Sequence, residues 1–151
     1  MLNTNKNLDD DNKCKNTGDK KHHDHVDEEL SSWEDLKVKT TLLRGIARIA
    51  WDNPSPIQQK AINPMINKHD IIAQAQSGTG KTGCFTISTL ELIDETVNET
   101  QAIIISPTRE LSIQTKNVLD TLGTCMKKLK TALLVGGTSS DTDVKNLHDN
   151  T

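Results

Sequence analysis

Residues 75–82, Ala-Gln-Ser-Gly-Thr-Gly-Lys-Thr, form the segment of this sequence best suited to chemistry. They follow a short apolar stretch and open a segment of helical character. Gly78 and Gly80 allow a tight turn whose backbone N–H groups surround an anion, and the next helix directs its positive end there. In such loops Lys81 reaches the outer phosphates and Thr82 places its hydroxyl on Mg²⁺. The pattern predicts a nucleoside triphosphate site, with an ordinary glycine turn as the weaker alternative. Ala75 departs from the usual first glycine.

The composition divides the chain into two parts. Residues 1–30 carry five lysines against eight acidic residues and few apolar ones. Such a segment buries too little surface to offset its ordering entropy, so we expect a disordered tail. The remaining residues carry thirteen charges of each sign. Because that part has no net charge, any nucleic-acid binding must come from a local patch.

Cysteine and histidine usage gives no sign of a disulfide framework or a metal site. The cysteines are Cys14, Cys84 and Cys125. They are odd in number and form no Cys-x-x-Cys pair, which fits a reducing compartment. His22, His23 and His25 lie in the polar tail, where solvated side chains are a better interpretation than a metal cluster. No apolar run approaches the ~20 residues that span a bilayer, so we expect no membrane partner.

Helical and strand-like patterns alternate after the tail. Apolar spacing and capping residues predict helices over residues 41–50, 57–66, 81–95, 108–123 and 141–149, the second kinked or ended early by Pro64. Apolar runs predict buried strands over residues 71–75, 101–106 and 131–135. This order predicts an α/β fold with a parallel sheet. Three strands are few for such a sheet, so the domain looks unfinished.

Three blocks stand in a specific order in the sequence. They are Pro54-Ser55-Pro56-Ile57-Gln58, the phosphate loop, and Pro107-Thr108-Arg109-Glu110-Leu111, with Gly136-Gly137 following. Together they resemble the N-terminal part of DEAD-box ATP-dependent RNA helicases, most closely the translation initiation factor 4A group. The resemblance runs from about Ser31 to the last residue, and the family tolerates Ala75. It implies a RecA-like P-loop NTPase domain, divided into a tail (1–30), a Q-motif region (31–59) and part of the ATP-binding domain (60–151).

The resemblance implies an ATP and Mg²⁺ site. Its nucleotide contacts are Trp33, Gln58, Ala75, Gln76, Ser77, Gly78, Thr79, Gly80, Lys81 and Thr82, with the last two catalytic and Thr82 on Mg²⁺. In the family, the glutamine bonds the adenine edge and an upstream aromatic, here Trp33 in place of phenylalanine, stacks on the base. Trp51 is the aromatic beside the Q motif, preceded by Ala50 where the family usually has glycine. Without the family, a helix-surface amide for Gln58 and core positions for both tryptophans are the better interpretations.

The resemblance also implies an RNA site. Its residues are Pro107, Thr108, Arg109, Gly136 and Gly137. A helix N-terminus beside an arginine suits a phosphodiester, although a plain capped helix start explains the first three residues equally well. A glycine pair alone is more often a simple turn. Contacts to phosphate and sugar would make binding independent of RNA sequence. Translation-initiation or RNA-processing proteins would be partners, in the cytoplasm or the nucleus.

Two rival interpretations remain beside the helicase. Residues 67–70 match the Asn-Lys-x-Asp string that reads guanine in GTPases, but they precede the phosphate loop, so a polar turn is favoured. The sequence holds no Asp-Glu-Ala-Asp block. We therefore expect a fragment or truncated product that binds adenine nucleotide weakly and does not unwind RNA by itself. The alternatives are a nucleotide-binding or interaction module without ATPase activity, and another P-loop ATPase or kinase.

Overall fold

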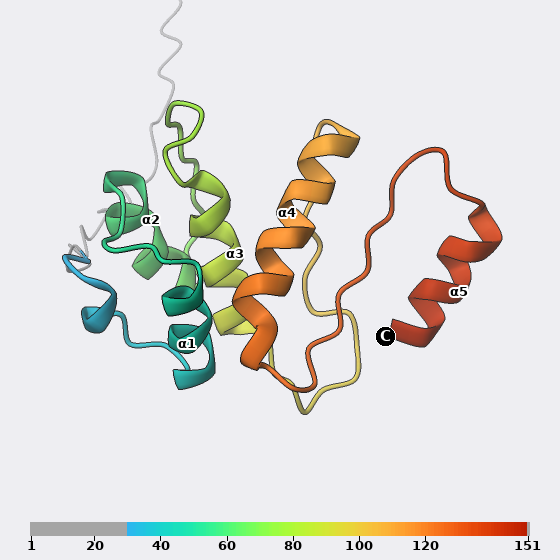
Figure 1. Ribbon diagram of the computed structural model, residues 1–151, viewed down its shortest axis with the longest axis horizontal. Helices are drawn as coiled ribbons and strands as arrows, with labels where there is room; N and C mark the ends of the chain where they lie inside the picture. Colours follow the sequence, from blue (N-terminus) through green and yellow to red (C-terminus); the bar gives the residue numbers. More distant parts are fainter. Residues whose placement is uncertain (1–29, 151) are drawn as a thin grey trace, which may run out of the picture.

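A computed structural model describes residues 30–150 of the chain, which form a helical array (Figure 1). The elements are η1 (Trp33–Asp35), α1 (Thr40–Arg48), α2 (Pro56–Ile66), α3 (Lys81–Leu92), α4 (Arg109–Leu122), η2 (Gly123–Cys125) and α5 (Ser140–Asn150). All five predicted helices are present, and α2 runs through Pro64 for two more residues. The predicted tail and its histidines lie outside the described residues, except Leu30, which is buried in the core.

The three predicted strands are absent from residues 30–150. Segments 71–75, 101–106 and 131–135 have no regular hydrogen-bonded structure, so the prediction of a parallel sheet is wrong for this structure. Ile103 is 80% exposed and Ile105 90% exposed, which shows that no second layer covers them. A strand exists only where a neighbouring chain completes its ladder of hydrogen bonds, so apolar β-branched sequence alone does not make one.

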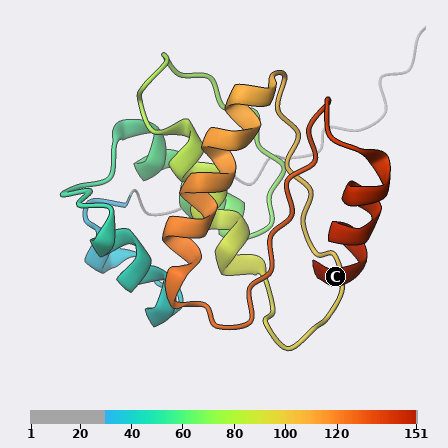
Figure 2. The ribbon, with the colours of Figure 1, turned by 45° about the vertical axis from the view of Figure 1, so that its right-hand side comes forward.

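The extended segments nevertheless preserve the connectivity of an α/β fold. Figures 1 and 2 show segments 101–106 and 131–135 running beside α4, between it and α5. The N-termini of α3 and α4 point to the same end of the molecule in both views. Parallel neighbouring helices need such a return segment, because the chain must travel back the length of one helix before starting the next. Helix α5 stands apart from the other helices in both views.

Helix α3 lies at the centre of the packed helices. It contacts α1, α2 and α4. The core residues are Leu30, Trp33, Leu36, Leu42, Ile46, Ala61, Ile62, Cys84, Ile87, Leu90, Leu122 and Met126. They come from η1, α1, α2, α3, α4 and the segments beside them, so burial of apolar surface fixes α3 relative to its neighbours. Within the described residues, no helix is both long and apolar enough to cross a membrane.

Hydrogen bonds at helix ends define where the helices start. Thr108 caps α4, its Oγ1 accepting from the N–H of Leu111 at 3.3 Å. At η1, the hydroxyls of Ser31 and Ser32 and the N–H of Ser32 donate to the carboxylate of Asp35. The Ser31 hydrogen bond, followed by those of Ser32, holds the pKa of Asp35 below its ordinary value. These local polar contacts are readable from sequence because donor and acceptor lie within four residues of each other.

The C-terminus of α3 is held by a lysine from outside the helix. The ammonium of Lys39 donates to the carbonyls of Leu90, Glu91 and Ile93, and the N–H of Lys39 donates to Oε2 of Glu91 at 2.8 Å. The last carbonyls of a helix have no partners within it and carry its negative partial charge. Lys39 therefore satisfies these carbonyls and joins the start of α1 to the end of α3.

Replacing this lysine tests its contribution to stability. Lys39→Met keeps the apolar stem and removes the charge, so we expect the free energy of unfolding to fall by about 1–3 kcal/mol, the range for hydrogen bonds to a charged group. Urea denaturation measures the change. Lys37→Met is the matched control, because Lys37 is exposed two residues away. Equal losses in the two variants would contradict a specific role for Lys39.

Ala50 ends the α1 turn in a conformation that suits glycine. Its φ is 55°, in the left-handed region. An L-residue there costs roughly 1–2 kcal/mol because its Cβ crowds the following carbonyl. Glycine at this position would avoid that cost. The chain therefore keeps the turn geometry but stores strain in it.

Replacing Ala50 by glycine should stabilise the protein. We expect Ala50→Gly to raise the free energy of unfolding by up to about 1 kcal/mol, since relief of strain exceeds the added entropy of the unfolded chain. Ala47→Gly is the control, because Ala47 is exposed within α1 and glycine there should cost about 0.5–1 kcal/mol. A rise in the free energy of unfolding for Ala50→Gly and a fall for Ala47→Gly, measured by thermal or urea unfolding, would support strain at Ala50. A fall for both variants would refute it.

Candidate functional site

The predicted phosphate loop forms a tight turn against the start of α3. Gly78 has φ 80° and Gly80 has φ 96°, both in the region that glycine occupies without strain. Gly80 is the N-cap, and α3 begins at Lys81. The first N–H groups of a helix have no partner within it, so they face the loop and are available to an anion. The backbone geometry therefore fits a phosphate group.

Lys81 lies over this loop. Its ammonium donates to the carbonyls of Ala75 and Gln76, each at 2.5 Å. The hydroxyl of Thr79 donates to the same Gln76 carbonyl at 2.8 Å. A phosphate ligand would therefore have to draw the ammonium away from two carbonyls. Thr82 follows in the first turn of α3, partly exposed, so the residues predicted for phosphate and Mg²⁺ lie together.

Gln58 joins the Q-motif region to the phosphate loop. The residue is 4% exposed, its Oε1 accepts from the N–H of Ser55 at 2.8 Å, and its Nε2 donates to the carbonyl of Gly80 at 3.3 Å. Gln58 is therefore no surface amide. A primary amide has two N–H groups and two lone pairs, so one of each remains for a ligand after these bonds. The remaining N–H group and lone pair match an acceptor and donor pair such as the N7/N6 edge of adenine.

Trp33 is a core residue whose ring stacks on Trp51. It is 9% exposed, and the ring centroids are 6.1 Å apart with 25° between planes. Its Nε1–H is buried without a hydrogen-bond partner among the described residues. One face of the indole is therefore covered by protein. Trp33 as the base-stacking residue stays a prediction, because its packing here is the core position that the residue type alone indicates.

Trp51 and Gly83 are site neighbours that sequence reasoning did not single out for a role. A Cβ built on Gly83 would lie 2.5 Å from Nε2 of Gln58 and 2.8 Å from Cη2 of Trp51. Trp51 therefore closes the space beside the Gln58 amide. The only sequence signal was an aromatic close to the Q motif, since residues 51 and 83 meet through tertiary packing.

The two predicted RNA segments meet at Arg109. Its Nη1 donates to the carbonyl of Gly136 at 3.1 Å, across 27 positions of sequence. Gly137 has φ 92°, and a Cβ built on it would lie 3.2 Å from Nη1 of Arg109. Pro107, Thr108 and Arg109 are exposed at the start of α4. The structure thus brings together a helix N-terminus, an arginine and a glycine pair on one surface.

Cys84 adds no reactive group to the site. It is buried in α3, and burial raises the pKa of its thiol to about 11. A thiol with that pKa is protonated at neutral pH and is a poor nucleophile.

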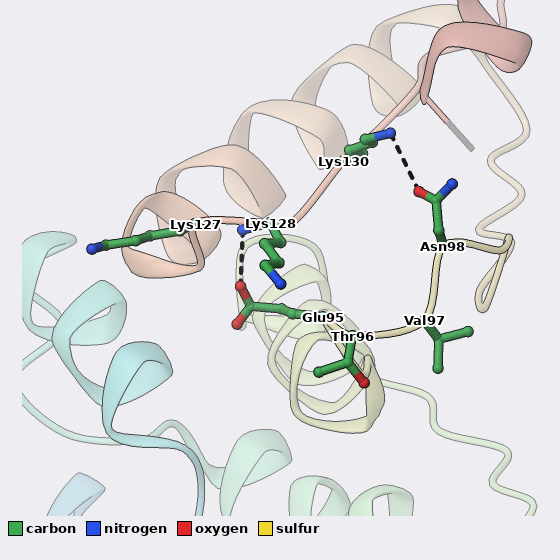
Figure 3. Close-up of a pocket in the computed structure, with 7 residues that line it drawn as sticks. All are labelled: Glu95, Thr96, Val97, Asn98, Lys127, Lys128 and Lys130. Carbon is green, nitrogen blue, oxygen red and sulfur yellow. Dashed lines mark hydrogen bonds between the residues drawn. The ribbon is translucent and has the colours of Figure 1, made fainter.

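A cavity of about 430 Å³ lies beyond the opposite end of α3 (Figure 3). It is lined by Glu95, Thr96, Val97, Asn98, Lys127, Lys128 and Lys130. The carboxylate of Glu95 accepts from the N–H of Lys128 at 2.9 Å, and the ammonium of Lys130 lies 3.4 Å from Oδ1 of Asn98. The lysines are exposed and the phosphate loop contributes nothing to this cavity, so it is separate from the nucleotide site.

Comparison with known proteins identifies the family. A model of the DEAD/DEAH box helicase family matches residues 55–151, which include the phosphate loop and the Pro-Thr-Arg-Glu-Leu block. The chain belongs to the DEAD/DEAH box helicase family. The ATP-dependent RNA helicase eIF4A of Chaetomium globosum is 48% identical over 125 residues, and that of Yarrowia lipolytica is 48% identical over 121 residues. These alignments cover 83% and 80% of this chain and 31% and 30% of the relatives.

Solved structures of DEAD-box proteins superpose on the fold of this chain. A DEAD box protein from Methanococcus jannaschii superposes with a TM-score of 0.69 at 33% identity, over 79% of this chain and 32% of its own. A Saccharomyces cerevisiae Dbp5 variant bound to RNA and ADP BeF3 superposes at 0.67 with 34% identity, over 74% and 29%. The structural neighbours are DEAD-box RecA-like domains, and this chain spans about a third of their length.

Proposed function

We propose that this chain is the nucleotide-binding part of an ATP-dependent RNA helicase. The observation that carries the proposal is the contact of Gln58 with Gly80, which brings a buried amide against the phosphate loop. A triphosphate alone needs only the loop, whereas a purine base needs a donor and acceptor at a fixed distance from it. The relatives' names, ATP-dependent RNA helicases, support the same assignment.

The residues of the site divide the work on Mg-ATP between them. The N–H groups of the loop and of the first turn of α3 hold the phosphates, and Lys81 neutralises their outer charge. Thr82 would supply a hydroxyl to Mg²⁺. Gln58 would bond the adenine edge and Trp33 would stack on the base. ATP itself supplies the phosphoryl group whose hydrolysis drives helicases.

RNA would bind through its backbone at the Arg109 surface. Pro107, Thr108 and Arg109 would meet phosphate at the α4 N-terminus, and Gly136 and Gly137 would let the strand approach the main chain. Residues 31–151 have no excess positive charge, so RNA binding would depend on this local arrangement. Partner proteins would be those of translation initiation or RNA processing.

A second candidate is a nucleotide-binding module without turnover. The sequence contains no Asp-Glu-Ala-Asp block, to which the family resemblance assigns the Mg²⁺-holding acid. Charge neutralisation by Lys81 does not by itself position a water for attack. RNA-stimulated phosphate release by this polypeptide separates the two: binding without release supports the module.

Replacing the loop lysine tests the nucleotide site. We expect Lys81→Ala to weaken Mg-ATP binding at least tenfold, measured by isothermal titration calorimetry, because a charge-assisted contact contributes about 1.5–3 kcal/mol. Lys127→Ala is the matched control, since that exposed lysine lies beside the separate cavity. Unchanged affinity in Lys81→Ala would show that the loop does not hold the phosphates.

Replacing the arginine tests the RNA surface. We expect Arg109→Ala to weaken binding of single-stranded RNA to a similar degree for different sequences, and to reduce the salt dependence by about one phosphate contact. Fluorescence anisotropy at several salt concentrations measures both effects. Lys116→Ala removes a positive charge from the same helix, where Lys116 pairs with Asp120. Equal effects of the two variants would point to general electrostatics and against a site at Arg109.

A further inference from the structure

Gly83 lies where α3 meets both the Gln58 amide and Trp51. A Cβ on Gly83 would stand 2.5 Å from Nε2 of Gln58, 2.8 Å from Cη2 of Trp51 and 3.0 Å from Cζ3 of Trp51. Gly83 is buried in the first turn of α3 with ordinary helical geometry. Alanine is the better helix residue, so the backbone does not require glycine there. The close approach of Gln58 and Trp51 leaves no space for a side chain at this position.

We propose that Gly83 is a positioning residue that sets the preference for adenine through Gln58. Without a side chain at residue 83, the amide of Gln58 and the outer ring of Trp51 share the volume beside α3. The amide then donates to the carbonyl of Gly80 and stays beside the phosphate loop. This inference rests on the proposed function, because it assumes that Gln58 reads the base.

Packing decides which group would yield to a methyl at residue 83. The Trp51 ring is stacked on the buried Trp33, so its movement would disturb the core. The Gln58 amide is the end of a flexible side chain and is the easier group to displace. Moving Nε2 to an ordinary contact distance takes roughly 1 Å, enough to break its 3.3 Å bond to Gly80. A methyl at residue 83 should therefore act on the amide before it acts on the phosphate loop.

The geometry also predicts which second substitution compensates. Cη2 and Cζ3 belong to the six-membered ring of the Trp51 indole, and phenylalanine has no atoms that far from its Cβ. Trp51→Phe therefore opens space into which the Gln58 amide can shift without leaving the loop. Gly83 and Trp51 should be coupled, so that the double variant is less impaired than Gly83→Ala alone.

Calorimetric titration of four variants with three probes tests the inference. The variants are Gly83→Ala, Trp51→Phe, their combination and Gln58→Ala; the probes are Mg-ATP, Mg-GTP and inorganic tripolyphosphate. We expect Gly83→Ala to bind Mg-ATP about tenfold more weakly while tripolyphosphate changes less than about twofold. Gln58→Ala should match this pattern. Trp51→Phe should keep the preference for ATP, and the double variant should recover several-fold in affinity.

Each other outcome identifies what failed. Equal losses for ATP and tripolyphosphate, or no loss in Gly83→Ala, would overturn the role of Gly83. Wild-type protein that binds none of the three probes would refute the proposed function before any variant is compared. Wild-type protein that binds ATP and GTP equally would remove the base-reading role of Gln58 and the inference with it, while leaving the phosphate loop in place.

Folding of the variants is checked by circular dichroism. Where Gly83→Ala does not fold, Gln58→Ala/Gly83→Ala takes its place, because removing the amide removes the contact at 2.5 Å. The inference predicts that this double variant folds at least in part and shows no preference for ATP over GTP. A double variant as unfolded as Gly83→Ala would place the clash elsewhere and contradict the inference.

Discussion

Helix α3 depends on polar groups that hold it at both ends from outside. At its N-terminus the amide of Gln58 bonds Gly80, and at its C-terminus the ammonium of Lys39 bonds three carbonyls. Apolar packing around Ile87 and Leu90 fixes the middle of the helix but is not directional along its axis. The hydrogen bonds supply that direction. They set where α3 starts, and therefore where the phosphate loop turns and where its free N–H groups point.

The same arrangement joins the residue proposed to read the base to the residues proposed to hold the phosphates. Gln58 belongs to α2 and Lys81 to α3. Both adjoin Gly80, because the Gln58 amide donates to its carbonyl and Lys81 is the next residue in the chain. A shift of α2 along α3 would carry the amide away from the loop. The stack of the buried Trp33 on the partly buried Trp51 resists such a shift, because its rings fill space beside these helices. Under the proposed function, specificity for the base therefore depends on how α2 packs against α3.

Sequence reasoning succeeded where the cause was local and failed where it was not. The five helices, the Thr108 cap and the glycine turn depend on residues within one or two turns of each other, so they could be predicted. The strands could not, because a run such as residues 101–106 becomes a strand only with a paired neighbour. The stacking of Trp33 on Trp51 and the contact of Gly83 with Gln58 join residues 18 and 25 positions apart. Only packing reveals such pairs.

Residues 31–151 are formally neutral overall but have local positive charge at two helix N-termini. The residues after the tail carry equal numbers of positive and negative charges, so no overall field steers a nucleotide or RNA toward them. The N-termini of α3 and α4 lie at the same end of the molecule (Figures 1 and 2), beside Lys81 and Arg109 respectively. Each of these positive helix ends therefore has a cation beside it. Because they act over short range, exposed carboxylates elsewhere do not cancel them at the salt concentration of a cell.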